Sequence, residues 1–483
     1  MADDRSLDLF GRNGSDNRTN DDASFGEFTA DDMYIAAGRH AAKSVISADT
    51  NPSPDFDGDG TVGFSDFLAL AGVFGSRRGD GRYEARYDLN SDGEIGFPDF
   101  LIFAQSFGGA PPSTGGGDGA AAVAIPDENL RAVIAYSLGK ALGAPISRAE
   151  MATLTRLEAP DEDIRDLAGL EAAVNLTRLD LSGNRISNVV PLSGLSGLEF
   201  LDLYYNSISD VRPLSGLTGL DTLGLGYNSL PSLSALSGLT NLSVLGIAGN
   251  GISNFTPLSD LSRLEFLDTS DNGISSLAAL VSVLSNLTNL RGLSLADNSI
   301  SGVSALSDFI RLEHLDLDNN RISDVSALSN LTRLTVLWLA GNRISNVSAL
   351  SGLTRLEFLD IDDNNISDVS VLSNLTNVEW LWLAGNGVSN VSALSGLTRL
   401  GSLDLASNRV SDLAPLVANT GLGEGDWVEV SNNPLSATSI NVHIPALQRR
   451  GVDVSYGASK LAASNKRKDL LPAIMGGYAG TGP

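Results

Sequence analysis

The chain has 483 residues, of which 42% are hydrophobic and only 6% aromatic, and its formal net charge is −26. A chain this acidic repels phosphate backbones and anionic lipid surfaces, so nucleic acid and anionic membranes are excluded as expected partners. The absence of cysteine excludes disulfides, thiol chemistry and thiolate zinc sites. No apolar run reaches the ~18 residues of a membrane span, and the polar, acidic N-terminus shows no signal peptide.

Six segments follow one another along the chain. Residues 1–52 are mostly polar, and we expect a flexible N-terminal arm. Residues 53–109 contain two copies of one acidic pattern, and residues 110–121 (APPSTGGGDGAA) form a Pro/Gly/Ser linker. Residues 122–150 have apolar positions at helical spacing and predict a helical cap. A 22-residue repeat then fills residues 151–457, and residues 458–483 are expected to be a disordered tail.

The acidic pattern occurs as DFDGDGTVGFSDF from Asp55 and DLNSDGEIGFPDF from Asp88. Each copy places oxygen ligands at loop positions 1, 3 and 5, glycine at the sharp turn of position 6, and a carboxylate at position 12. This is the spacing at which Ca²⁺ collects six to eight oxygens, with a backbone carbonyl at position 7. Two aligned copies with matching flanks make a chance match of an acidic loop a poor explanation. The sequence predicts two Ca²⁺ ions with the ligands Asp55, Asp57, Asp59, Thr61, Asp66, Asp88, Asn90, Asp92, Glu94 and Asp99.

Apolar residues surround both loops. Val62 and Ile95 occupy position 8, where two such loops pair, and an apolar helix is expected from Phe67 and again from Phe100. The chain thus contains two copies of a calcium loop followed by a helix, and the last ligand of each loop, at position 12, is Asp. This arrangement resembles a dockerin domain. The resemblance implies a small all-α EF-hand domain that docks to a cohesin-like module, often in assemblies that degrade polysaccharides. At the positions through which dockerins contact cohesin, this chain has Phe64–Ser65 and Phe97–Pro98 rather than Ser-Thr pairs.

The repeat has the strand motif LxxLxLxxN. Its steps are 22 residues, except for 26 before Asn298 and 25 before Asn433, and a degenerate copy starts at Leu154. The leucines point inward, and only stacked coils can bury them. The asparagine can satisfy backbone groups at the turn after the strand, so we predict a structural role for it. Including the degenerate copy there are about thirteen coils, with asparagines at Asn184, Asn206, Asn228, Asn250, Asn272, Asn298, Asn320, Asn342, Asn364, Asn386, Asn408 and Asn433.

This 22-residue form, with ISDVSAL after the asparagine, resembles the bacterial internalin-like leucine-rich repeats over most of residues 122–457. The resemblance implies an α/β repeat solenoid, a horseshoe with a parallel β-sheet on its concave face and short 3₁₀ segments on its convex side. It also implies protein recognition outside the cell or at its surface. The segment NVHIPALQRRGVDVSY is expected to close the C-terminal end.

Alternate strand residues face the concave side, so the residues on that face can be named from the sequence. They combine acids with aromatics in two groups, and all four tryptophans fall in the C-terminal group. Exposed aromatics beside acids favour a hot spot for a basic or amphipathic protein ligand. The alternative is that the rings only stack on one another and the acids keep the protein soluble. The predicted ligand-binding residues are Phe200, Asp202, Tyr204, Tyr205, Tyr227, Asp316, Trp338, Phe358, Asp360, Trp380, Trp382, Asp404 and Trp427.

No sequence signature of catalysis is present, because the chain lacks G-x-S-x-G, HExxH, a phosphate loop and a dinucleotide fingerprint. We therefore predict a non-enzymatic, calcium-stabilised recognition or adhesion protein, extracellular or at the cell surface. A rival hypothesis is a non-catalytic, dockerin-bearing component of a polysaccharide-binding or polysaccharide-degrading assembly, since sugars also stack on tryptophan. A third is a surface structural protein without a specific ligand.

Overall fold

The computed structural model describes residues 122–457 continuously and, before them, residues 54, 56, 62, 64–74, 76–78, 81–87, 89, 94–95 and 103. These residues form two compact units. The larger contains residues 124–139 and 154–457, and the smaller contains the described residues up to 123 together with 140–153. The predicted arm (1–52), linker (110–121) and tail (458–483) lie entirely outside the described residues.

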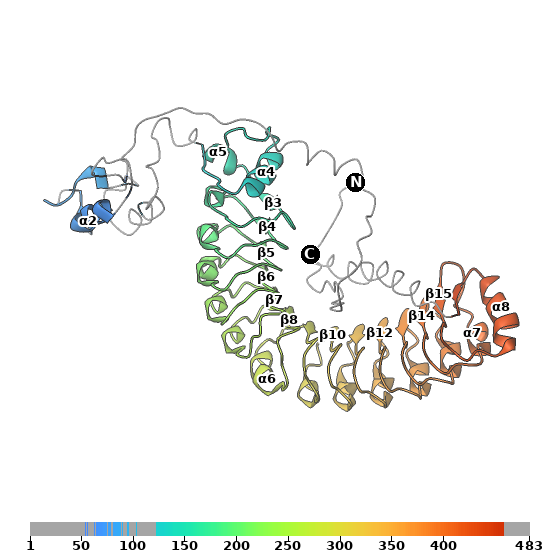
Figure 1. Cartoon of the computed structure of the whole chain (residues 1–483). Coiled ribbons are helices and arrows are strands. Elements are labelled where there is room, and N and C mark those ends of the chain that lie inside the picture. Colours follow the sequence, from blue (N-terminus) through green and yellow to red (C-terminus); the bar gives the residue numbers. More distant parts are fainter. Residues whose placement is uncertain are drawn as a thin grey trace. The chain divides into compact units, whose positions relative to one another are not determined.

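The larger unit is a solenoid with one parallel β-sheet whose fourteen strands follow one another in chain order. Equivalent residues pair across neighbouring coils, for example Leu315 with Leu337. The strands line the inner side of the arc in Figure 1 and the short helices its outer side, which confirms the predicted leucine-rich-repeat horseshoe. The strands are β3 (Arg156–Glu158), β4 (Arg178–Asp180), β5 (Phe200–Asp202), β6 (Thr222–Gly224), β7 (Val244–Gly246), β8 (Phe266–Asp268), β9 (Gly292–Ser294), β10 (His314–Asp316), β11 (Val336–Trp338), β12 (Phe358–Asp360), β13 (Trp380–Trp382), β14 (Ser402–Asp404), β15 (Trp427–Glu429) and β16 (Asp453–Ser455).

Short helices form the outer side because a 22-residue coil leaves room for only one tight turn between strands. Where the coil is longer, an α-helix replaces the 3₁₀ turn: α6 (Ala278–Leu284) in the 26-residue step and α7 (Ala414–Ala418) in the 25-residue step. The 3₁₀ helices are η2 (Leu170–Ala172), η3 (Val190–Leu192), η4 (Arg212–Gly216), η5 (Ser234–Leu236), η6 (Thr256–Leu258), η7 (Ser304–Leu306), η8 (Ser326–Asn330), η9 (Ser348–Gly352), η10 (Ser370–Asn374) and η11 (Ser392–Gly396).

The repeat asparagines connect each coil to the one before it. The Asn342 side-chain amide donates to the carbonyls of Leu317 (2.9 Å) and Leu339 (3.1 Å), and also to that of Ala340. Its oxygen accepts the backbone N–H of Ile322 at 2.9 Å. Asn320 and Asn364 repeat these contacts one coil away on either side. The predicted structural role of the asparagines is confirmed.

Helix α4 (Glu128–Ser137) covers the first coil, as the helical spacing predicts, with Leu130 and Ile134 buried. Its N-cap is Asp127, whose Oδ1 accepts the N–H groups of Asn129 and Leu130 and whose Oδ2 accepts that of Arg165 at 2.8 Å. One carboxylate therefore both starts the helix and ties it to the repeat. In the smaller unit, α5 (Arg148–Met151) begins with the expected capping box between Ser147 and Glu150.

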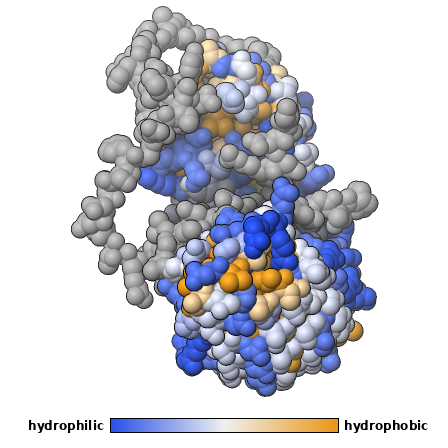
Figure 2. All heavy atoms as spheres, turned by 90° about the vertical axis from the view of Figure 1, so that its right-hand side faces the viewer, coloured by the Kyte–Doolittle hydropathy of each residue, from blue (hydrophilic) through white to orange (hydrophobic). Residues whose placement is uncertain are grey.

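The C-terminal end closes with a π-helical turn η12 (Ser439–His443), α8 (Ile444–Gln448) and strand β16. The Arg450 guanidinium donates to the carbonyls of Leu416, Val417 and Asn419, which end α7. Figure 2 faces this end and shows apolar residues gathered beside strongly hydrophilic ones. Exposed apolar side chains here include Ile440 and Val442. The segment acts as a cap, as expected, and its last strand β16 extends the sheet, which was not predicted.

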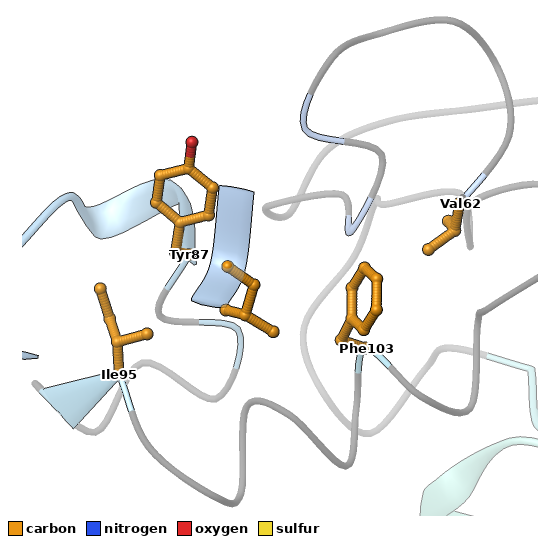
Figure 3. Close-up of a cluster of buried hydrophobic side chains, with 5 residues drawn as sticks. Val62, Tyr87, Ile95 and Phe103 are labelled. Carbon is orange, nitrogen blue, oxygen red and sulfur yellow. The ribbon is translucent and has the colours of Figure 1, made fainter. Parts of the chain in front are cut away.

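The smaller unit contains α2 (Phe64–Val73), η1 (Ala85–Tyr87) and an antiparallel pair of two-residue strands, β1 (Ser76–Arg77) and β2 (Glu94–Ile95). The first expected helix is confirmed, whereas the second lies outside the described residues except for Phe103. The two strands were not part of the all-α expectation: the backbone of Ile95 pairs with that of Ser76, and its side chain belongs to the same buried core as Val62. The buried core, drawn in Figure 3, consists of Val62, Leu70, Tyr87, Ile95 and Phe103.

Replacing Asn342 with Ala should lower the free energy of unfolding by about 3 kcal/mol or more, because it leaves several buried backbone groups without partners. Chemical denaturation followed by circular dichroism measures this. The matched control is Asn346→Ala in the same coil, since the exposed Asn346 accepts only the N–H of Ser348 and its loss should cost about 1 kcal/mol or less. Equal effects of the two substitutions on the free energy of unfolding would contradict the structural role of the repeat asparagines.

The concave face as a candidate recognition surface

The predicted ligand-binding residues fall into two groups on the concave side of the sheet. The N-terminal aromatic cluster is Phe200, Tyr204, Tyr205 and Tyr227, on β5 and the turns that follow β5 and β6. The C-terminal aromatic cluster is Trp338, Phe358, Trp380, Trp382 and Trp427, on β11, β12, β13 and β15.

The rings of the C-terminal aromatic cluster pack against one another. Phe358 lies 5.3 Å from Trp338 and 4.9 Å from Trp382 between ring centroids, the second pair edge-to-face at 80°. Phe358 is fully buried, Trp382 is 3% exposed and Trp427 is 4% exposed, so the expected exposure of these three is wrong. For Phe358 and Trp382 the reason is geometric: strands lie about 4.8 Å apart, and a ring on one strand covers its neighbours. Trp338 and Trp380 are half-buried and remain accessible in part.

The acidic residues at the ends of the strands have a structural role that the sequence interpretation missed. Asp316, Asp360 and Asp404 are buried, and each accepts through Oδ1 the backbone N–H two residues further on, at 2.8–3.1 Å. Asp202 and Glu429 repeat this contact. Such contacts hold the tight turn after the strand. The signal was available, since an Asp two residues before a turn is a common way to fix it.

The ring of Tyr204 lies across the sheet and packs directly on the backbone of glycines in the next two coils. A Cβ added to Gly226 would lie 2.2 Å from the Tyr204 ring, and one on Gly246 would lie 2.7 Å from it. The Tyr204 hydroxyl donates to Asp268 Oδ2 at 2.7 Å, so the ring is fixed at both ends. The sequence carried this signal as well: glycine replaces the usual acid on the two strands that follow Tyr204, at Gly224 and Gly246.

Tyr205 and Tyr227 occupy the turn position of their coils in the left-handed region, each with φ of 51°. Bulky L-residues rarely adopt this conformation. Equivalent positions in other coils hold Gly, Asp, Asn or Ser, for example Gly249 and Ser407. The two tyrosine rings stack in parallel, 4.5 Å apart with 5° between their planes, and Tyr205 is 45% exposed. This aromatic pair, in which Tyr205 is exposed and Tyr227 is half-buried, is thus kept at a backbone position that disfavours it.

Burial raises the pKa of Asp202 to about 6, and the neighbouring Asp180 adds to the shift. Burial also raises the pKa of Asp268 to about 6, although hydrogen bonds from Ser270 and Tyr204 oppose the shift. Burial lowers the pKa of His314 to about 4, so that the imidazole is neutral at pH 7. The two carboxyl groups therefore change charge in the weakly acidic range, and the histidine does not.

Comparison with known proteins agrees with this architecture. The family described as Leucine Rich repeats (2 copies) matches residues 174–217, 288–330, 332–374 and 376–418. The crystal structure of an internalin (inlF) from Listeria monocytogenes is 32% identical, and the match covers 62% of this chain and 94% of that one, with a TM-score of 0.52. The chain belongs to the internalin-like leucine-rich-repeat family. Internalin C2 (inlC2) from the same species is 26% identical over 52% of this chain and 91% of its own, with a TM-score of 0.31. No protein with a curated description matches the sequence.

Internalin-like leucine-rich-repeat proteins are typically non-catalytic. One serine–histidine–aspartate grouping does occur near the C-terminal cap, where Ser439 Oγ and Asp412 Oδ1 approach His443 Nδ1 at 3.5 and 3.4 Å. Both contacts meet at the same ring nitrogen, whereas a catalytic triad uses opposite nitrogens. Ser439 is also buried and donates to the Ser411 carbonyl. This grouping is a structural contact of the cap.

Most of the predicted calcium ligands lie outside the described residues: Asp55, Asp57, Asp59, Thr61, Asp88, Asn90, Asp92 and Asp99. Asp66 is buried, and its Oδ1 accepts the backbone N–H of Phe56 at 2.5 Å, so position 12 of the first loop meets position 2. Glu94 lies in β2. Within the described ranges, no group of three or more acidic or histidine side chains is gathered as a metal site, and no helix has the length and apolar character of a membrane span.

The raised pKa of Asp268 predicts a measurable pH dependence of stability. Its pKa is about 6 in the folded protein against an ordinary value of 3.8, so the protonated carboxyl favours folding, and this contribution is lost as pH rises from about 4 through 6. Asp268→Asn removes the titration. The free energy of unfolding of the variant minus that of the wild type should rise between pH 3.5 and 7 by at most about 3 kcal/mol. Urea denaturation at several pH values measures it, Asp202→Asn should behave alike, and a flat difference would contradict the assignment.

Proposed function

We propose that this internalin-like protein is a recognition or adhesion protein, outside the cell or at its surface, that binds a protein ligand on its concave face and catalyses no reaction. The observation that carries the proposal is the stacked pair Tyr205–Tyr227. Strained backbone positions of this kind persist where the surrounding structure holds them, and they concentrate at functional sites. Since the fold needs only a positive φ at this position, a stacked aromatic pair there, with Tyr205 exposed, is best explained by contact with another molecule.

The surroundings of the pair favour a cationic, partly apolar polypeptide. Tyr204 packs against both rings at 6.0 and 6.2 Å, and the exposed Asp271 and Asp297 lie near Tyr227, whose pKa they help to raise. Aromatic rings supply contact area at low entropic cost, and nearby acids select a basic partner. Further along the sheet, the half-buried Trp338 and Trp380 extend the same combination.

A peptide library displayed on phage and selected on the immobilised full chain tests this proposal. We expect enriched peptides that combine Lys or Arg with aromatic or aliphatic residues. Tyr205→Asn with Tyr227→Asn should weaken their binding by roughly tenfold or more, as loss of a hot spot does. The thermal midpoint should not fall, because Asn tolerates the left-handed conformation better than Tyr.

The matched control is Ser407→Asn, which changes the same turn position in a distant coil and should leave peptide binding unchanged. Polysaccharides applied to the same immobilised protein examine the rival partner class. Binding of a polysaccharide that the tyrosine double variant loses, with no enriched peptide, would replace a protein ligand by a carbohydrate. Peptide binding that the double variant retains would overturn the placement of the site.

We further propose that the smaller unit is dockerin-like and binds two Ca²⁺ ions. Support comes from the buried Asp66, because a carboxylate at position 12 that meets position 2 of the same loop lies where a loop must close around an ion. The shared core of Val62 and Ile95, which hold position 8 of the two loops, also fits. The ions would stabilise this unit, and a cohesin-like module is the partner that the resemblance suggests.

Calorimetric titration of the full chain with Ca²⁺ should give two binding sites. Asp55→Ala should remove one and Asp88→Ala the other, because each change deletes the first ligand of its loop. Asp308→Ala, which removes an exposed acid of the solenoid, should change neither the number of sites nor their affinity. No binding at millimolar Ca²⁺, or binding that all three variants retain, would overturn the calcium proposal without affecting the recognition proposal.

A further inference from the structure

A shallow hollow of about 490 Å³ lies at the start of strands β5 and β6, whereas the tyrosine pair follows the end of the same two strands. Only one of the residues around it, Phe200, was predicted from the sequence to contact a ligand. We call this feature the rim hollow, and the residues that line it include Arg178, Glu199, Phe200, Asp221, Thr222 and Arg263.

The rim hollow contains two carboxylates without a cation. The residue directly before a strand is acidic in several coils and can pair with a cation of a neighbouring coil, as Glu379 pairs with Arg399, twenty residues further on. The position twenty residues after Glu199 is Gly219, so that cation is missing here. The carboxylates of Glu199 and Asp221 are exposed and form no ion pair or hydrogen bond with any residue that the structure describes. The rim hollow thus offers two acids and a space where a cation fits.

The bottom of the rim hollow supplies a second, independent observation. Thr222 lies on the concave side of β6, since the next residue, Leu223, is buried in the leucine core. Thr222 is 6% exposed, and its hydroxyl forms no hydrogen bond within the described part of the chain. Buried hydroxyl groups normally have a partner, and a hydroxyl can accept from an N–H donor. A ligand group with several N–H donors would therefore satisfy the hydroxyl and the carboxylates together.

The two arginines of the rim hollow are already engaged by the protein. The Arg178 guanidinium lies over the Phe200 ring, 3.6 Å from its centroid, and its Nε is 3.3 Å from the Glu158 carboxylate. Arg263 donates to the Asn241 side-chain oxygen at 2.9 Å. The charge that lacks a partner is therefore negative, which favours a basic group over an anion. The planar guanidinium of arginine carries five donors and suits two carboxylates on adjacent coils, about 4.8 Å apart.

The rim hollow and the tyrosine pair belong to the same two coils. Phe200 and Tyr205 are five residues apart on the β5 coil, and Thr222 and Tyr227 are five residues apart on the β6 coil. Along an extended strand this separation is at most about 17 Å. An extended polypeptide that lies along β5 and β6 covers the same distance in about five of its own residues.

We propose that the rim hollow binds an arginine side chain of the polypeptide ligand, and that an aromatic or aliphatic residue about five positions away in the ligand contacts Tyr205 and Tyr227. This inference rests on the proposed function and adds a second subsite to it. The guanidinium donates to Glu199, Asp221 and the Thr222 hydroxyl. The ligand therefore runs along the strands at β5 and β6 and not across successive coils.

Peptides of defined spacing test this proposal. Each contains one Arg and one Trp in a Gly-Ser background, two to nine positions apart, and binding to the immobilised full chain is measured by surface plasmon resonance. Affinity should be highest at a spacing of four to six positions. Replacement of the Arg by citrulline, which is neutral and similar in shape, should weaken the best peptide about fivefold, as expected for loss of partly exposed ion pairs. Salt should reduce this difference.

Glu199→Gln with Asp221→Asn should abolish the difference between the Arg peptide and the citrulline peptide. The matched control is Glu265→Gln with Glu313→Gln, which removes the same charge from the same position of two other coils. These acids contact Arg291 at 3.6 and 3.7 Å, so the control should keep the full difference.

A third variant, Gly219→Arg, fills the rim hollow from within. It restores the cation that Glu379 has in Arg399, and it should also abolish the difference between the two peptides. A Cβ at this position would lie 3.1 Å from the Ser196 carbonyl oxygen, so the denaturation midpoint of each variant is measured alongside. The acid double variant, which adds no atoms to the backbone, provides the test if Gly219→Arg lowers that midpoint.

An Arg–citrulline difference that survives in the acid double variant would overturn the proposal, and so would affinity that does not depend on spacing. Tyr205→Asn with Tyr227→Asn should remove the contribution of Trp and preserve the Arg–citrulline difference. If only the tyrosine variant weakens binding, the proposed recognition site stands and the rim hollow is not part of it. If only the acid double variant does, the rim hollow binds a basic side chain and the tyrosine site is wrong.

Discussion

The asparagine ladder is the interaction on which the rest of the structure depends. A coil of 22 residues makes a sharp turn after its strand, and the backbone groups of that turn are buried between coils. One side-chain amide satisfies groups of its own coil and of the preceding one together, as Asn342 does with Leu339, Leu317 and Ile322. Because the same contact recurs from coil to coil, strand positions stay in register over the whole sheet, and residues separated by 22 positions become neighbours.

This regularity explains why the fold was predictable from the sequence. The period, the inward leucines and the asparagines all reflect the same constraint, which is that coils of equal length stack on one another. The strands, the outer helices and the degenerate first coil at β3 could therefore be predicted from the pattern alone. Two elements that the repeat pattern does not encode were not predicted. Strand β16 lacks the repeat motif, and the replacement of a 3₁₀ turn by α6 depends on four extra residues whose conformation the repeat does not specify.

The candidate site was predictable in position and less so in character. The sequence placed the aromatic and acidic residues on the correct face, but exposure depends on the side chains of the neighbouring coils. Phe358 is covered by rings that come from β11 and β13, and the carboxylate of Asp360 is engaged by a backbone amide of its own turn. Residue type alone does not distinguish a side chain that contacts a partner from one that stabilises the sheet. The positive φ of Tyr205 and Tyr227 is the additional observation that favours contact with a partner for these two residues.

The left-handed turn position has a consequence for how such a protein can change. The fold requires only a positive φ at this position, and Gly, Asp, Asn, Ser and Tyr all adopt it in different coils. The side chain at that position lies outside the leucine core, and it contacts the equivalent side chain of the next coil, as Tyr205 stacks on Tyr227 and Asn319 donates to Asp297. The margin of the sheet therefore presents a row of variable positions, in which a side chain also contacts the equivalent position of a neighbouring coil. New binding specificity can therefore arise by substitutions at these positions. Randomising them in an engineered library would diversify the surface and leave the leucine core and the repeat asparagines unchanged.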